Sequence, residues 1–129
     1  IAMASGIATL KELKKQNPFD TFNIVAEKIE TILKEAAKEN NVVLQVNRFG
    51  SMINPFFSKN KIVDFKTAQT SDTEKFKTFF WSMIQNGVFL PPSQFEAWFL
   101  STALSNKDLK IIEKAIYAAM QAIDQHHNS

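Results

Sequence analysis

Cysteine is absent from this 129-residue sequence, and glycine occurs only three times. Without cysteine the chain can form neither disulfides nor thiolate metal sites, which is compatible with a reducing compartment, and we expect the cytoplasm. A loop that binds phosphate needs several neighbouring glycines, because backbone amides must approach the ligand closely. Gly6, Gly50 and Gly87 are far apart, so no local phosphate site is predicted.

A strong charge of one sign is also missing, as are long apolar runs. Fifteen basic and thirteen acidic residues leave a formal net charge of +2, and the lysines are spread along the chain, so we expect no nucleic-acid partner. No apolar run approaches the roughly 20 residues that cross a bilayer, so no membrane span is expected. The apolar start IAMASGIATL has no basic region before it, which argues against a secretion signal. Because Ile1 is not a methionine and no capping residue precedes a helical pattern, we expect a chain cut at its N-terminus.

Apolar residues make up 45% of the sequence, with twelve phenylalanines, which is enough for the core of one domain. Helical spacing predicts a first helix from Met3 to Asn17-Pro18 and a second that ends near Asn40, with Asn17 or Asp20 as its cap. Three later helices, of which the middle one is short, are predicted by capping boxes, in which two side chains satisfy unpaired amides of the first turn. The expected boxes are Ser71 with Glu74, Ser93 with Glu96, and Ser105 with Asp108.

Alternating and β-branched apolar residues predict extended segments between the helices. Gly50 interrupts the first of them, Pro55 favours a bulge or an edge position, and Gly87 suits a left-handed helix end. This order of elements predicts an α+β domain, with helices packed on one face of a small antiparallel sheet. The expected extended segments cover residues 42–46, 52–57, 62–65 and 88–90.

Few side chains suggest chemistry by themselves. Arg48, the only arginine, can bind a carboxylate or phosphate ligand, or it can form a surface ion pair, which is the more common arrangement. His126 and His127 are adjacent near the end of the chain without carboxylates beside them, so a solvated tail is favoured over a metal site. Glu96 can reach back to the cap amide of its helix, and this structural role does not exclude a role in a site.

Aromatic residues are dense in the second half of the chain. Their helical spacing favours core packing over a stacking platform for ligands. The first helix and its neighbours have more apolar surface than so small a sheet can cover, so we also expect an apolar patch that meets another protein surface. The aromatic residues are Phe76, Phe79, Phe80, Trp81, Phe89, Phe95, Trp98 and Phe99.

Residues 71–97, SDTEKFKTFFWSMIQNGVFLPPSQFEA, resemble the C-terminal domain of the glutamate-1-semialdehyde 2,1-aminomutase family. Residues 2–10 resemble the family helix that follows a Gly-Asn-Pro turn. Residues 46–52, VNRFGSM, resemble its Val-Asn-Arg-x-Gly-Ser-Met strand, and a Phe-Phe pair follows downstream. The resemblance covers nearly the whole chain in the correct order and spacing. Trp98 departs from it, because the family commonly has glycine there.

The resemblance implies a parent enzyme of fold type I, a cytoplasmic homodimer that uses pyridoxal phosphate to isomerise glutamate 1-semialdehyde to 5-aminolevulinate in tetrapyrrole biosynthesis. The family's Schiff-base lysine and other cofactor-binding residues lie upstream, so it implies no catalytic, cofactor-binding or metal-binding residue in this chain. Glu96 aligns with the glutamate of the Pro-Ser-Gln-Phe-Glu motif, which lies at the substrate pocket, where it can pair with an arginine from the N-terminal segment. The implied division is a terminal helix of the large domain at 1–17 and the small domain at 18–129.

Three hypotheses remain open. In the leading one, the chain is the C-terminal fragment of such an enzyme, is inactive and free of cofactor alone, and has the large domain as its partner. In the second, it is a free-standing α+β module that binds a protein or small ligand, which an intact gene with its own start codon near Ile1 would favour. In the third, it is a cleaved piece paired with its complement or with itself, which light scattering would detect.

Overall fold

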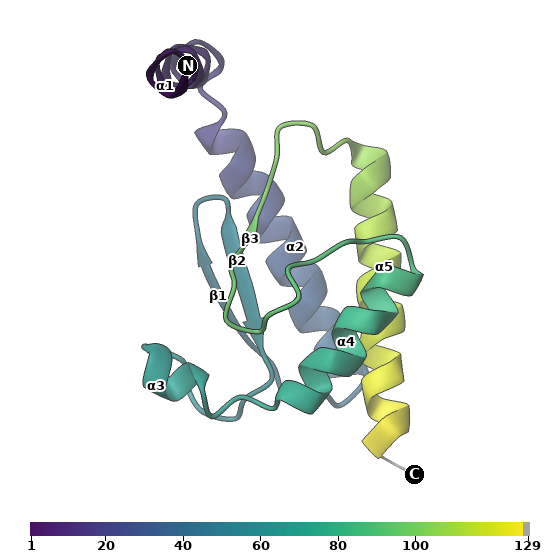
Figure 1. Ribbon diagram of the computed structural model, residues 1–129. Coiled ribbons are helices and arrows are strands. Elements are labelled where there is room, and N and C mark those ends of the chain that lie inside the picture. The colour runs from purple at the N-terminus through teal and green to yellow at the C-terminus, as the bar shows by residue number, and fades with distance from the viewer. Residues whose placement is uncertain (128–129) are drawn as a thin grey trace.

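The computed structural model describes the backbone of residues 1–127 and the side chains of residues 1–125. Helices and a small antiparallel sheet make up this part of the chain, which confirms the predicted α+β class (Figure 1). The elements are α1 (Ala2–Gln16), α2 (Phe19–Glu39), β1 (Gln45–Phe49), β2 (Met52–Phe56), α3 (Phe65–Ala68), α4 (Thr73–Gln85), β3 (Trp98–Phe99) and α5 (Asn106–His127).

The sheet has the strand order β1-β2-β3. A tight turn joins β1 to β2 at Gly50, whose φ of 56° lies in the left-handed region that glycine adopts without steric cost. Pro55 lies opposite Val46 of β1, whereas β3 pairs only with Met52 and Ile53 at the start of β2. The predicted bulge or edge position is wrong, because β2 is the central strand and its register with β1 is unbroken. Pro55, which has no N–H to donate, is tolerated there because it lies where β3 does not reach.

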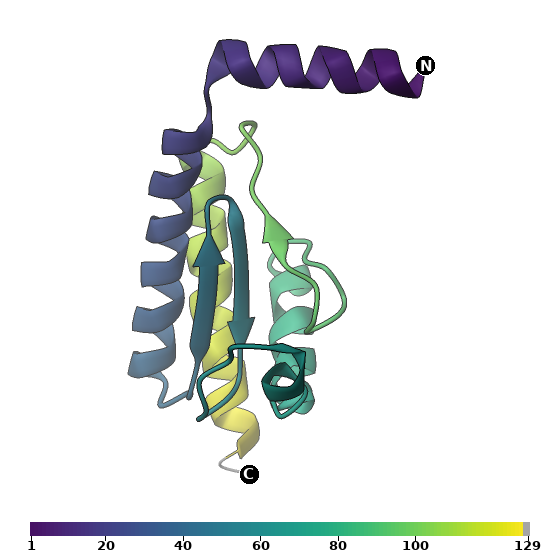
Figure 2. The same cartoon turned by 90° about the vertical axis from the view of Figure 1, so that its left-hand side faces the viewer.

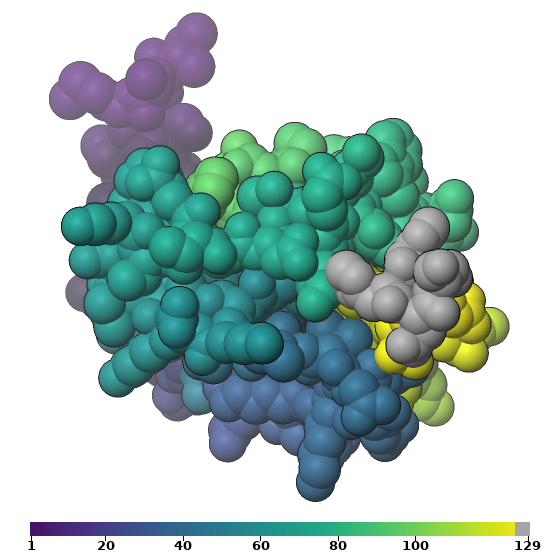
Figure 3. Space-filling view, turned by 90° about the horizontal axis from the view of Figure 1, so that it is seen from below, coloured from purple at the N-terminus to yellow at the C-terminus, as the bar shows by residue number. Residues whose placement is uncertain are grey.

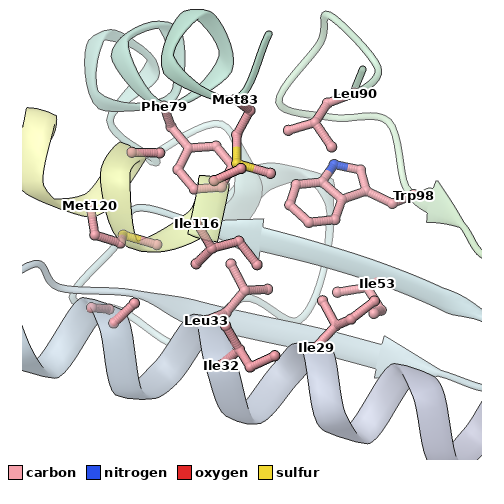
Figure 4. Close-up of a cluster of buried hydrophobic side chains, with 14 of the residues drawn as sticks. Ile29, Ile32, Leu33, Ile53, Phe79, Met83, Leu90, Trp98, Ile116 and Met120 are labelled. Carbon is pink, nitrogen blue, oxygen red and sulfur yellow. The ribbon is translucent and has the colours of Figure 1, made fainter. Parts of the chain in front are cut away.

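The core lies between the sheet and the three long helices α2, α4 and α5. Helix α2 packs along the β1–β2 hairpin, and α5 packs against both α2 and α4 (Figures 1 and 2). Side chains from all these elements meet in one cluster (Figure 4). Each large apolar side chain buried there contributes on the order of 1.5–3 kcal/mol. The cluster includes Ile29, Ile32, Leu33, Ile53, Phe79, Met83, Leu90, Trp98, Ile116 and Met120.

Helix α1 extends away from the other elements and has no buried residue (Figure 2). Seen from the opposite end, it projects beyond the outline of the domain (Figure 3). Asn17 ends α1 in the left-handed conformation, with φ 43°, and its N–H donates to the Leu13 oxygen at 2.9 Å. The predicted cap of α2 by Asn17 or Asp20 is wrong, because Asn17 serves the end of α1 and α2 begins after Pro18 without a side-chain cap.

The strand predicted over 42–46 begins later and becomes β1. The N–H of Val42 donates to the Ala37 oxygen at 2.8 Å, so the chain is still leaving α2 at that point. The extended segment predicted at 62–65 is wrong. Asp64 and Thr67 form a capping box there, which turns the chain into the short helix α3.

Two predictions around α4 also need correction. Its cap is Asp72, whose side chain accepts from the Lys75 N–H at 3.0 Å, so the predicted box of Ser71 with Glu74 is one residue too early. Gly87 has the predicted positive φ, 81°. The segment 88–90 is not a strand, because the backbone at 88 bonds back to the end of α4 at Met83.

Candidate functional site

Residues 93–96 form a tight turn between α4 and β3. The Ser93 Oγ accepts from the Phe95 N–H, and the Ser93 oxygen accepts from the Glu96 N–H, both at 3.2 Å. The predicted short helix ending near Phe99 is therefore wrong, since one turn leads directly into β3. Ser93 caps this turn, but no bond of the expected capping box is formed by the Glu96 carboxylate.

Glu96 is exposed, and its carboxylate makes no hydrogen bond or ion pair with any residue of the described chain. It lines a groove with a volume of about 700 Å³ between α2, α5 and the loop that follows α4. The groove is mostly apolar, and Asp108 is its other carboxylate. Asp108 is already engaged, because it accepts from the N–H and hydroxyl of Ser105 at 2.8 and 2.6 Å, which lowers its pKa and forms the predicted capping box of α5. Glu96 is thus the groove carboxylate whose charge is available to a ligand or a partner.

Trp98 forms part of the inner wall of this groove. Its side chain is 7% exposed and stacks on Phe79, with ring centroids 6.0 Å apart and an angle of 11° between the planes. Met83 and Leu90 lie around the indole (Figure 4). The indole therefore belongs to the core. Its Nε1 is buried and has no acceptor among the described residues.

Arg48 forms an ion pair. Its Nε donates to Glu30 Oε2 at 2.6 Å, and Lys34 Nζ lies 2.6 Å from Glu30 Oε1. Hydrogen bonds from Lys34 and then from Arg48 lower the pKa of Glu30. Of the two roles considered for Arg48, the structure shows the ion pair, which joins β1 to α2. Sequence reasoning missed Glu30, although its position one helical turn before Lys34 was a usable signal.

Two apolar surfaces are left uncovered. On the face of the sheet away from α2, Phe49, Met52 and Phe99 form a row across the three strands, and the two phenylalanines are 79% and 73% exposed. On α1, the apolar residues Met3, Ile7 and Leu10 are also exposed. These surfaces agree with the expected apolar patch.

Other sites are not apparent in the part of the chain that the structure describes. It contains no group of three or more histidine, cysteine or acidic side chains suited to a metal ion. The side chains of His126 and His127 lie outside the described residues. None of the described helices has the length and apolar character needed to cross a membrane.

The sequence is similar to curated glutamate-1-semialdehyde 2,1-aminomutases. It is 48% identical over 110 residues to the protein of Sulfurihydrogenibium sp. (strain YO3AOP1) and 40% identical over 125 residues to that of Aquifex aeolicus (strain VF5). The alignments cover 85% and 97% of this chain but only 26% and 29% of the relatives. No protein-family model matches the chain.

Solved structures show where this fold occurs. An omega-transaminase from Sphaerobacter thermophilus matches 94% of this chain and 27% of its own with a TM-score of 0.79 at 20% identity. A protein described as a transaminase with PLP bound matches 98% of this chain and 28% of its own with a TM-score of 0.78 at 18% identity. The chain is thus homologous to the C-terminal part of glutamate-1-semialdehyde 2,1-aminomutases, has the transaminase fold of that region, and spans about a quarter of those relatives' length.

Proposed function

We propose that this chain is the C-terminal part of an aminomutase that converts glutamate 1-semialdehyde to 5-aminolevulinate in tetrapyrrole biosynthesis. The observation that carries the proposal is the 48% identity to the Sulfurihydrogenibium aminomutase. Pyridoxal phosphate is the proposed cofactor of the whole protein, supported by the fold neighbour described as a transaminase with PLP bound. The cytoplasm and a homodimer are proposed for the parent on the family resemblance.

The described residues of this chain do not themselves suit that cofactor. Pyridoxal phosphate needs a lysine for its aldehyde carbon and several donors for its phosphate. The groove beside Glu96 is lined by no lysine, arginine or histidine of the described chain, and the three glycines are far apart. We therefore place the cofactor on the rest of the longer protein, and we expect the 129-residue chain alone to be inactive and to bind none.

Glu96 is the proposed substrate-binding residue. Its carboxylate is exposed at the groove and unpaired within the described chain, so it is free to bind a cation. Suitable cations are the amino group of a substrate and the arginine that the family resemblance implies. A charge-assisted hydrogen bond of this kind both binds and orients its partner.

The proposed partner is the preceding part of the same protein. Residues 1–17 are proposed to belong to that large domain and residues 18–129 to the small domain. Helix α1 supports this division, because none of its residues is buried against the rest of the chain. The uncovered row of Phe49, Met52 and Phe99 supplies a second surface for the same partner.

The test measures 5-aminolevulinate formation by the longer natural protein, by its Glu96→Gln variant and by the 129-residue chain alone. Glu96→Gln is expected to lower kcat/KM roughly tenfold or more, because a charged contact to substrate is lost. Glu27→Gln, the same change at an exposed position of α2, is the control. Product formation by the 129-residue chain alone, or unchanged kinetics in Glu96→Gln, would contradict the proposal.

A further inference from the structure

Gln94 is a buried polar residue in the middle of the turn that leads to Glu96. It is only 3% exposed, and its Nε2 donates to the backbone oxygen of Pro55 at 2.7 Å. Burying an amide without a hydrogen bond is costly, and the bond to Pro55 satisfies its NH₂ end, whereas the buried Oε1 has no donor among the described residues. The orientation of the amide follows from the chemistry, because only its NH₂ end can donate to a carbonyl.

The Pro55 oxygen is available because β3 is short. Strand β3 pairs with β2 only as far as Ile53, two residues before Pro55. Further along the same edge, the Leu100 N–H donates to the Ser51 oxygen at 3.1 Å. The side chain of Gln94, which precedes β3 in the chain, therefore adds one hydrogen bond to this edge of β2 beyond the residues that pair with β3. This bond fixes the turn to the central strand.

The turn has few other attachments. On its outer side, the Phe95 ring meets the Phe65 ring of α3 edge-on, with centroids 5.6 Å apart, and the two residues are 43% and 64% exposed. The Glu96 carboxylate makes no hydrogen bond or ion pair that would hold it in place within the described chain. The direction of that carboxylate therefore depends on where the backbone of the turn lies.

We propose that Gln94 is a positioning residue, which holds the backbone of the 93–96 turn so that the Glu96 carboxylate faces its ligand. Its relevance to catalysis rests on the proposed function of Glu96. Gln94 acts through the Pro55 oxygen and needs no contact with substrate. Loss of this bond frees the turn locally and leaves the helical core intact, because the bond is separate from the cluster in Figure 4.

The first experiment uses the 129-residue chain and does not depend on activity. Gln94→Met keeps a similar volume and removes the donor, and Gln121→Met is the control at an exposed position of α5. Amide hydrogen exchange is measured by NMR at Glu96, in the turn, and at Leu109, whose N–H donates to the Ser105 oxygen at the start of α5. Gln94→Met is expected to speed exchange at Glu96 about tenfold and to leave Leu109 unchanged. Equal changes at both amides, or no change at Glu96, would overturn the proposal.

If Gln94→Met does not fold, Gln94→Asn replaces it, since its shorter side chain keeps the amide but cannot reach Pro55 without moving the turn. The second experiment uses the longer protein and combines Gln94→Met with Glu96→Gln. Each change is expected to raise KM for glutamate 1-semialdehyde, and the double variant should be no worse than Glu96→Gln alone, because both act on one contact. Independent, additive effects would overturn the proposal. If Glu96→Gln alone has no effect, the function proposed for Glu96 fails, and the exchange experiment still decides whether Gln94 holds the turn.

Discussion

Replacing Trp98 by alanine is expected to lower the free energy of unfolding by about 2–4 kcal/mol. Truncating a buried aromatic side chain costs about 3–5 kcal/mol, which includes the loss of its stack on Phe79. Part of this is offset, because the buried Nε1 has no acceptor among the described residues and its removal relieves a cost of about 1 kcal/mol. Trp98→Phe keeps an aromatic ring and removes the same N–H, so it should destabilise the chain less than Trp98→Ala does.

The assay is urea unfolding of the 129-residue chain followed by far-UV circular dichroism, which does not depend on either tryptophan. Trp81→Ala is the matched control, because Trp81 is 56% exposed on α4 and its ring meets that of Phe80 edge-on. Trp81→Ala should lower the free energy of unfolding by less than about 1 kcal/mol. If Trp98→Ala were no more destabilising than Trp81→Ala, the indole would not be part of the core, and the description of the groove wall would be wrong.

Two further predictions concern charge and backbone conformation. Hydrogen bonds from Lys34 and Arg48 lower the pKa of Glu30 below 4.5, so their contribution to stability is present above about pH 4.5 and is lost as the pH falls through the lowered pKa. Arg48→Gln should therefore flatten the loss of stability between neutral pH and about pH 3 in urea unfolding, and an unchanged slope would contradict this. Gly87→Ala should destabilise by about 1 kcal/mol, because its φ is 81°. Gly6→Ala, within a helix and with open space around it, should not destabilise, and thermal unfolding compares the two.

Local signals predicted well where the chain interacts with itself over a few residues. Asn17 and Gly87 end their helices in left-handed conformations, and Ser105 with Asp108 caps α5. Each of these features depends on one turn of backbone. The α+β class followed from the order of such segments.

Short apolar segments were predicted poorly. Those at 62–65 and 88–90 have strand composition, yet one is turned by the Asp64 cap and the other bonds back to α4. The segment 93–99 has a capping signature, but its last two residues pair with β2. In pieces this short, one cap or one partner strand outweighs the intrinsic preference of the residues.

The candidate site was predicted only in part. Glu96 was chosen from the family resemblance, and its role in binding substrate stays a prediction. Gln94 and Glu30 were missed, because their partners, Pro55 and Arg48, lie 39 and 18 residues away in the sequence. Lys34, one turn after Glu30, was a local signal for that carboxylate, but no local pattern predicts the pairing of Glu30 with Arg48 or of Gln94 with Pro55.

By itself, the amino-acid sequence determined the long helices, the C-terminal ends of α1 and α4, the cap of α5 and the kinship with aminomutases, since these depend on neighbouring residues and on the order of recognisable blocks. The tertiary structure alone decided that Gln94 bonds the turn before β3 to the Pro55 oxygen, that Trp98 is buried in the core and that Arg48 forms an ion pair with Glu30. The physical reason is that hydrogen bonds and packing between distant segments form only once the helices and the sheet have been brought together.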